Sequence, residues 1–207
     1  MRVISGEKKG EKLFSLKRRE IRPTSDKVKG AIFNILSYGL EFGQSMEGKK
    51  VLDLFAGSGA LGLEALSRGA EEVVFVDNSS ASLNLTRKNL KKLGFENKGK
   101  MVKKDILRFL RSENEITSGG FDLILADPPY GKGLCQKLLG ILAEKSFLNA
   151  DGILVMEHHK KEKIEEKRNF ILLQKRKYGD TLISFFKKKS INDKRSFYEK
   201  GDLCRDF

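Results

Sequence analysis

A chain of 207 residues, 39% of them apolar, is long enough for one domain with a substantial hydrophobic core. It contains no apolar run of about 18 residues, so no membrane-spanning helix is expected. The first ten residues, M-R-V-I-S-G-E-K-K-G, lack the apolar segment of a signal peptide, and we expect a cytoplasmic protein. Its few possible metal ligands of the Cys and His type are Cys135, Cys204, His158 and His159, and no metal ion is expected to bind.

The net charge of +13 is concentrated at the two ends of the chain. Residues 1–30 hold 10 Lys/Arg and 4 Asp/Glu, residues 157–207 hold 15 and 9, and residues 31–156 hold 16 and 15, which gives +6, +6 and +1. A nearly neutral centre with basic flanks is typical of a scaffold that handles a small ligand while its edges bind a polyanion. A lysine-rich surface that only keeps the protein soluble would give the same distribution, so charge alone leaves both interpretations open.

The N-terminal part of the chain predicts a small hairpin followed by a helix. Residues 2–4 and 12–16 are expected to pair as two short strands. Thr24 or Ser25 can cap the helix. The apolar residues of that helix have the spacing of one amphipathic face: Val28, Ala31, Ile32, Ile35 and Leu36.

The next stretch, from Lys50 to Leu66, reads K-V-L-D-L-F-A-G-S-G-A-L-G-L-E-A-L. It predicts a buried strand over 51–55 and a helix from residue 61, joined by glycines that let the chain turn tightly and approach a ligand closely. A second strand over 73–76 ends at Asp77, whose carboxylate could accept both hydroxyls of a ribose. These features suit NAD and S-adenosylmethionine equally. Asp53 lies inside the first strand, where dinucleotide-binding folds usually keep an apolar residue, and D-x-F-A-G-x-G resembles the S-adenosylmethionine loop of class I methyltransferases.

Residues 80–93 predict an amphipathic helix, and residues 101–102 a third short strand. Asp105 follows that strand. It can cap the helix that begins near Leu107, and in class I methyltransferases an acidic residue at this place binds the adenine amino group of the cofactor. Both roles stay open for Asp105.

The segment F-D-L-I-L-A-D-P-P-Y, residues 121–130, combines a short buried strand with a stiff exit. The strand must end at Asp127, because Pro128 and Pro129 have no N–H to donate to a neighbouring strand. Asp127 and the carbonyl of Pro128 could each accept one N–H of an exocyclic amine, which would orient the nitrogen and draw its lone pair out of conjugation. Tyr130 could stack on the base that carries the amine. The alternative is a simple Pro-Pro turn with a surface tyrosine.

The last third of the chain predicts a helix over 138–148, a strand over 153–156 and two final strands over 170–177 and 181–187. We interpret the paired His158 and His159 as surface polar residues. Residues 188–207 have few apolar residues, so an irregular or partly helical tail is expected.

Together these motifs resemble the bacterial RsmD family, which methylates the guanine amino nitrogen in small-subunit ribosomal RNA. The resemblance runs from Arg2 to about Phe186 and rests on R-V-I-S-G, R-P-T-S-D-K-V (22–28), F-N-I-L (33–36), D-L-F-A-G-S-G-A-L-G, D-P-P-Y and K-Y-G-D-T. D-P-P-Y also matches the amino-group motif [D/N]-P-P-[Y/F] of nucleic-acid N-methyltransferases in full. Two departures stand out: Gly30 replaces the family's usual Glu, and the tail beyond Lys187 has no counterpart.

The expected fold is α/β, a doubly wound, mostly parallel seven-stranded sheet of the class I methyltransferase, Rossmann-like type with an antiparallel final strand. Residues 1–45 would form an N-terminal RNA-binding extension of hairpin and helix, residues 46–187 the S-adenosylmethionine-dependent methyltransferase domain, and residues 188–207 a basic C-terminal tail. The protein is expected to act as a monomer on ribosomal RNA, within a small-subunit particle, and without a membrane.

The resemblance also implies roles for individual residues. Catalysis would fall to Asp127, Pro128 and Tyr130. S-adenosylmethionine would be bound by Asp53, Phe55, Ala56, Gly57, Gly59, Asp77, Asn78, Asp105 and Ile106. RNA would be held by Arg18, Arg19, Arg22, Thr24, Lys27 and Pro129.

Three other functions fit part of the pattern. A DNA adenine-N6 methyltransferase shares D-P-P-Y but normally needs a target-recognition region, for which this chain has no room. Methylation of an amide side chain in a protein would leave the basic flanks unexplained. A non-catalytic RNA-binding or ribosome assembly factor on the same fold would be distinguished by failure to bind S-adenosylmethionine.

Overall fold

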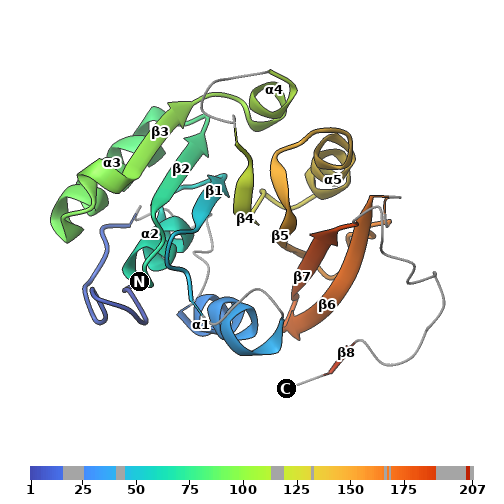
Figure 1. The fold of residues 1–207 in the computed structure, drawn as a ribbon, viewed down its shortest axis with the longest axis horizontal. Helices are drawn as coiled ribbons and strands as arrows, with labels where there is room; N and C mark the ends of the chain where they lie inside the picture. The colour runs from blue at the N-terminus through green and yellow to red at the C-terminus, as the bar shows by residue number, and fades with distance from the viewer. Residues whose placement is uncertain are drawn as a thin grey trace.

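The computed structural model describes residues 1–15, 26–40, 45–112, 119–131, 133–165, 167, 169–189 and 204–205. A single twisted sheet runs through the molecule, with helices on both faces (Figure 1). Its strands are β1 (Lys50–Leu54), β2 (Glu72–Asp77), β3 (Gly99–Lys103), β4 (Phe121–Ala126), β5 (Leu148–His159), β6 (Phe170–Tyr178), β7 (Thr181–Lys188) and β8 (Cys204–Arg205).

The strand order is β3-β2-β1-β4-β5-β7-β6-β8. Strands β1 to β5 are parallel to their neighbours among themselves, whereas β7 runs antiparallel to both β5 and β6. The predicted doubly wound sheet of seven strands with an antiparallel end is therefore confirmed. The two-residue β8, parallel to β6 at the sheet edge, was not expected in a tail predicted to be irregular or partly helical.

The helices are α1 (Asp26–Asn34), continued by the π-helical turn η1 (Ile35–Gly39), α2 (Ala60–Ser67), α3 (Ser80–Leu93), the 3₁₀ turn η2 (Glu96–Lys98), α4 (Ile106–Arg111) and α5 (Leu134–Glu144). Apolar residues of α1, α2 and α3 form one core with the N-terminal segment, and those of α4 and α5 form a second core on the other face of the sheet. No helix among these is long and apolar enough to cross a membrane.

Several predicted boundaries differ from the structure. The helix expected over 138–148 spans Leu134–Glu144, and the strand expected over 153–156 spans Leu148–His159, because Leu148 already pairs with Phe121 of β4. The hairpin expected over 2–4 and 12–16 is present in its described part, as an antiparallel bridge between Arg2 and Lys12 flanked by backbone hydrogen bonds from Val3 to Glu11 and from Leu13 to Met1. Residues 1–15 lie along the helical layer, where the N-terminus is beside α2 (Figure 1).

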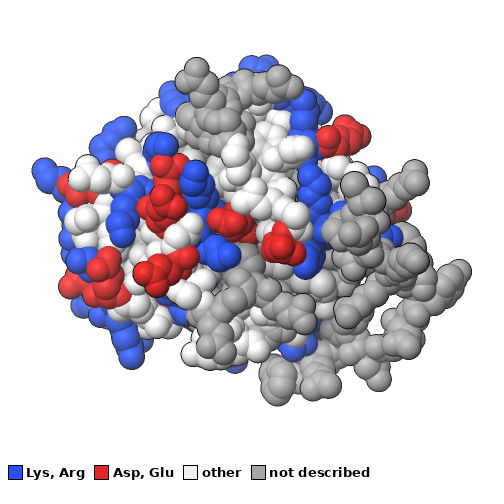
Figure 2. Space-filling model, in the orientation of Figure 1, with Lys and Arg blue, Asp and Glu red and all other residues white. Residues whose placement is uncertain are grey.

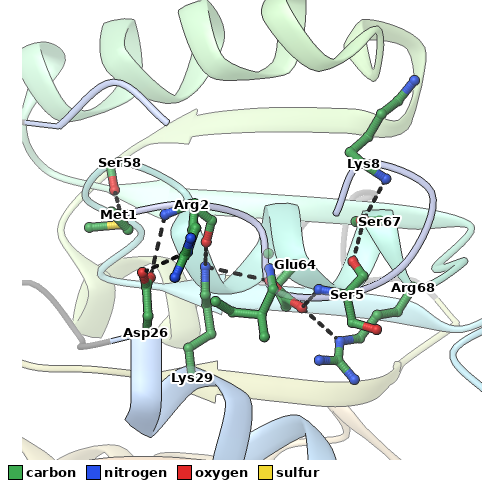
Figure 3. Close-up of polar contacts among 12 residues, drawn as sticks. Met1, Arg2, Ser5, Lys8, Asp26, Lys29, Ser58, Glu64, Ser67 and Arg68 are labelled. Carbon is green, nitrogen blue, oxygen red and sulfur yellow. Dashed lines mark hydrogen bonds and ion pairs between the residues drawn. The ribbon is translucent and has the colours of Figure 1, made fainter. Parts of the chain in front are cut away.

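A buried glutamate attaches this N-terminal segment to the fold. Glu64 of α2 is fully buried, and its carboxylate accepts hydrogen bonds from the backbone N–H groups of Ile4 (2.7 Å) and Ser5 (3.0 Å) and from Nε of Arg68 (2.8 Å) (Figure 3). The equally buried Nζ of Lys29, on α1, lies 3.4 Å from the same carboxylate. Burial lowers the pKa of Lys29, while the charge of Glu64 opposes that change. Because an unpartnered buried charge is strongly destabilising, this cluster fixes α1 and the N-terminal segment against α2.

His158 is buried, contrary to the expectation of a surface residue. It is 1% exposed, its Nε2 lies 2.9 Å from the hydroxyl of Ser184 on the antiparallel β7, and its Nδ1 lies 3.3 Å from the carbonyl of His159. Burial lowers the pKa of His158 to about 4. The ring is therefore neutral at physiological pH.

We predict that His158 makes the fold acid-sensitive. Protonation of the unfolded chain begins below the ordinary pKa of 6.5, whereas the folded protein resists it until about 4, so stability present above pH 6.5 is lost as the pH falls through this window. The loss should approach about 3 kcal/mol, at 1.36 kcal/mol per unit of pKa. Urea unfolding from pH 7 to pH 4 should show a shallower decline for His158→Gln, and equal pH dependence of the two proteins would contradict the assignment.

Candidate active site

Three aspartates converge at the carboxyl edge of the sheet. Asp53 lies in β1 and pairs in register with Phe75 of β2 and Leu125 of β4. Asp77 and Asp127 each follow those partners by two residues, at the ends of the neighbouring strands. The strand order β2-β1-β4 thus brings all three carboxylates to the edge where ligands bind in open α/β sheets.

The loop between β1 and α2 turns through unusual backbone angles. Phe55 has φ of 62°, the only positive value at a non-glycine residue in the described chain, and Gly57 and Gly59 follow with 56° and 77°. Strained angles of this kind persist where the surrounding structure enforces them, and they cluster at functional sites. A Cβ at Gly62 would lie 2.4 Å from the ring of Phe75, so glycine is needed there for α2 to pack against β2.

Asp77 holds this glycine loop in place. Its Oδ2 accepts a hydrogen bond from the N–H of Gly57 (2.9 Å), and its Oδ1 accepts one from the N–H of Ser79 (2.8 Å). Asp77, which was expected to bind a ribose, therefore also supports the glycine loop. Each of its oxygens retains a second lone pair for a ligand hydroxyl, and the neighbouring Asn78 is exposed.

Helix α3 holds the same loop from outside through two polar side chains that the sequence analysis missed. The hydroxyl of Thr86 donates to the Gly57 carbonyl (3.1 Å), and Nδ2 of Asn89 donates to the Ser58 carbonyl (2.9 Å). Both residues are fully buried. Polar residues three positions apart on the inward face of an amphipathic helix were the signal that could have identified them.

Asp53 is buried between the other two carboxylates. It is 2% exposed, and its Oδ2 accepts a hydrogen bond from the N–H of Gly62 (2.9 Å). Burial raises the pKa of Asp53 well above its ordinary value, against the effect of the Gly62 hydrogen bond, and the charges of Asp127 and Asp77 raise it further. A carboxylate in such surroundings is stabilised by a cationic ligand.

Asp105 and Ile106 lie at the start of α4. Asp105 caps the helix, because its Oδ1 accepts a hydrogen bond from the N–H of Arg108 (3.0 Å). Ile106 is buried in the core beneath α4. The helix-cap alternative for Asp105 is thus present in the structure, and a contact with cofactor stays a prediction.

The D-P-P-Y segment leaves β4 as predicted, since the strand ends at Ala126. Asp127 is half-buried, Pro128 is buried, and Pro129 and Tyr130 are exposed. The charge of Asp127 raises the pKa of both Asp53 and Tyr130. The amine motif and the glycine loop therefore belong to one electrostatic site.

Two further residues hold the hydroxyl of Tyr130. Its hydroxyl donates to Oε1 of Glu157, at the end of β5 (3.0 Å), and lies 3.1 Å from Oγ1 of Thr181, at the start of β7. Burial, with the nearby charge of Glu157, raises the pKa of Tyr130 to about 12 despite the Thr181 hydrogen bond. The ring of His159 contacts that of Tyr130 edge-on, at 5.6 Å between centroids. The hydrogen bond between Tyr130 and Thr181 connects D-P-P-Y with the K-Y-G-D-T motif, to which Thr181 belongs.

Most of the predicted RNA contacts cannot be placed. Arg18, Arg19, Arg22 and Thr24 lie outside the described residues, and Lys27 is exposed on α1. In the described part of the chain no group of His, Cys, Asp and Glu side chains has the arrangement of a metal site. Position 30 has room for a side chain, because a Cβ on Gly30 would meet only a methyl of Ile4 at 3.8 Å.

The strand order and the glycine loop define a Rossmann-like α/β methyltransferase fold, and solved structures agree. "Putative methyltransferase yhhF" from Escherichia coli superposes with a TM-score of 0.77 at 26% identity, covering 92% of this chain and 98% of that one. The "putative methylase HI0767" from Haemophilus influenzae gives 0.75 at 28%, covering 91% and 98%.

Sequence comparison gives the family. Residues 1–187 match the family model named "Conserved hypothetical protein 95". "Putative rRNA methyltransferase YlbH" of Bacillus subtilis is 38% identical over 91% of this chain and all of that protein. "Ribosomal RNA small subunit methyltransferase D" of Haemophilus influenzae is 31% identical over 86% of this chain and 89% of its own length. The chain therefore belongs to the RsmD family of methyltransferases.

We predict that the Asp53 carboxyl is kept at the expense of stability. Asp53→Asn should raise the free energy of unfolding of the ligand-free protein at pH 7, because burial raises the pKa of this carboxyl and so disfavours its ionised form in the folded state. A carboxyl whose pKa is raised by folding destabilises the native state only above its ordinary pKa of 3.8, so the gain should vanish as the pH falls toward that value. Urea unfolding at pH 7 and pH 4 measures the difference.

The matched control is Asp151→Asn, because the Asp151 side chain is 90% exposed and only one surface ion pair, with Lys187, would be lost. This control should change stability little at either pH. A variant at Asp53 that is less stable than wild type at pH 7 would contradict the prediction.

Proposed function

We propose that this protein transfers a methyl group from S-adenosylmethionine to the exocyclic N2 of a guanine in 16S ribosomal RNA. The observation that carries the proposal is the shared site. The strand order β2-β1-β4 brings Asp127, in the amine-binding motif, to the same edge of the sheet as Asp53 and Asp77, which hold the glycine loop, and the charge of Asp127 raises the pKa of Asp53. The names of the relatives, which specify ribosomal RNA and the small subunit, support the substrate.

The residues of the glycine loop fit S-adenosylmethionine, which supplies an electrophilic methyl group on a positively charged sulfonium and also carries an ammonium group. Asp53 is a buried carboxylate whose ionised form needs a nearby positive charge, and a cofactor with two such charges provides it. Asp77 would accept the ribose hydroxyls. The other proposed contacts come from Phe55, Ala56, Gly57, Gly59, Asn78, Asp105 and Ile106.

The chemistry required of the protein is mainly positioning. Asp127 and the carbonyl of Pro128 would each accept one N–H of the guanine amine, which aims the nitrogen lone pair away from the ring. The nitrogen loses one proton as the N–C bond forms, and Asp127 would accept it. Tyr130 would stack on the base. Its hydroxyl is bound by Glu157 and Thr181, which restricts the ring to one orientation.

The target base must leave its stack to enter such a site, which favours exposed or single-stranded RNA. Arg18, Arg19, Arg22, Thr24, Lys27 and Pro129 are the proposed RNA contacts. Phosphate contacts by the basic residues among them would make binding weaken steeply with salt. We propose that a monomer acts on RNA within a partly assembled small-subunit particle in the cytoplasm.

We predict that Asp127→Ala lowers methyl transfer at least about 100-fold, the usual scale for loss of a group that handles the transferred proton. The assay is transfer of labelled methyl from S-adenosylmethionine to small-subunit particles, free ribosomal RNA and DNA, followed by digestion to nucleosides. Wild type should yield 2-methylguanosine from RNA. Asp151→Asn, which removes an exposed aspartate, should match wild type.

Other products would point elsewhere. Methyladenine in DNA would identify a DNA adenine methyltransferase. Absence of transfer together with absence of S-adenosylmethionine binding would leave a non-catalytic assembly factor. Full activity of Asp127→Ala would remove the aspartate from the mechanism.

A second prediction separates the ring of Tyr130 from its hydroxyl. Tyr130→Phe keeps the stacking face but loses the bonds to Glu157 and Thr181, so kcat/KM should fall about 5- to 30-fold, the effect of 1–2 kcal/mol. Tyr130→Ala loses the stacking surface as well and should fall further. Equal losses in the two variants would mean that the hydroxyl, not the ring, carries the effect.

A further inference from the structure

A second surface feature lies away from the aspartate cluster. A groove of about 660 Å³ separates the end of the N-terminal segment from the outer side of α3. We call it the Phe14 groove, and its lining residues are Phe14, Ser15, Leu85, Lys88, Lys91 and Lys92. None of them belongs to the methyl-transfer site or to the individual RNA contacts predicted above, although Phe14 and Ser15 lie in the N-terminal extension expected to bind RNA.

Phe14 is exposed and yet rigidly held. Phe14 is 51% exposed, and it is one of three large hydrophobic residues that are exposed in the described part of the chain. Its N–H donates to Oδ1 of Asn89 (2.8 Å), and its carbonyl accepts from Nδ2 of the same side chain (3.0 Å). An aromatic ring on a fixed backbone can bind a flat partner with little loss of conformational entropy.

Three lysines of α3 surround this ring. Lys88, Lys91 and Lys92 have the i, i+3, i+4 spacing that places side chains on one face of a helix. The Nζ of Lys92 lies 5.9 Å from the centre of the Phe14 ring, and it also binds Glu11 and the Lys12 carbonyl. No ion pair involves Lys88 or Lys91 in the described chain. Figure 2 shows basic side chains along the left margin, over α3 and β3, with acidic ones between them.

We propose that the Phe14 groove binds substrate RNA outside the methyl-transfer site, with one unstacked base on Phe14 and flanking phosphates on Lys88 and Lys91. This inference rests on the proposed function, because it assigns a second contact to the same substrate. A flat aromatic ring beside cations is the combination with which proteins bind single-stranded nucleic acid. A protein partner docking through apolar surface is less favoured, since the groove offers only Phe14 and the half-buried Leu85.

One side chain connects the groove to the active site. Asn89 holds Phe14 on one side and donates to the Ser58 carbonyl of the glycine loop on the other. RNA bound at Phe14 would therefore be held at a defined position relative to the loop.

The first test uses three variants of Phe14 and a fluorescent single-stranded RNA of about 15 nucleotides, near the upper site size of a stacking platform. Phe14→Ala and Phe14→Leu should each weaken binding about tenfold, because neither side chain has a π-face, whereas Phe14→Trp should bind as wild type does. In methyl transfer to particles the first two should raise KM and leave kcat and S-adenosylmethionine affinity unchanged.

The second test removes charge. For single strands the slope of log K against log salt is about −0.7 per phosphate contact, so Lys88→Gln/Lys91→Gln should reduce its magnitude by about 1.4. The matched control is Lys50→Gln/Lys137→Gln. Both control lysines are exposed; Lys50 begins β1, and Lys137 belongs to α5, which packs on the other face of the sheet from α3. This control should leave the slope as in wild type.

Wild-type RNA affinity in Phe14→Ala and in the lysine double variant would overturn the proposal. Normal binding by Phe14→Leu, with loss only in Phe14→Ala, would also overturn it, because an apolar side chain would then suffice and no base would need to stack on a ring. Failure of the proposed function is a different result: RNA binding that depends on Phe14, in a wild-type protein that methylates no RNA.

Discussion

Hydrogen bonds from backbone N–H groups to buried carboxylates hold the active site together. Asp77 accepts from Gly57, and Asp53 accepts from Gly62, so the loop between β1 and α2 is attached at both of its ends. Burial raises the pKa of Asp53, and the charges of Asp127 and Asp77 nearby raise it further. The site is thus preorganised for positively charged ligands. When no such ligand is bound, the packing of the surrounding sheet and helices offsets the repulsion among the carboxylates.

The N-terminal segment depends on a second set of buried polar groups. Glu64 binds the backbone of Ile4 and Ser5, and Asn89 binds the backbone of Phe14 in the manner of a neighbouring strand. A segment too short to form its own sheet is thereby ordered by side chains of α2 and α3. Since Asn89 also holds the Ser58 carbonyl, the part of the protein proposed to contact RNA and the loop proposed to bind the cofactor share one support.

The fold could be predicted largely from the sequence because its signals are local. Alternating short apolar runs and amphipathic helices predicted the doubly wound sheet, and prolines ended β4 where expected. Boundaries were wrong where pairing partners distant in sequence decided them. The helix expected to reach Leu148 stops at Glu144, because Leu148 pairs with Phe121. The burial of His158 was missed for the same reason, because its hydrogen-bond partner Ser184 lies on β7, the strand that pairs with β5.

The sequence by itself determined the residues that carry the chemistry: the glycine loop, Asp53, Asp77 and D-P-P-Y. Proline restricts the backbone and glycine permits angles that other residues avoid, each at its own position, so such motifs can be recognised without a structure. Only the tertiary structure decided what supports them. Strands β4, β5 and β7 lie side by side, and this order brings Glu157 and Thr181 to Tyr130. Contacts between residues so far apart in the chain follow from strand order and register, which no local pattern records.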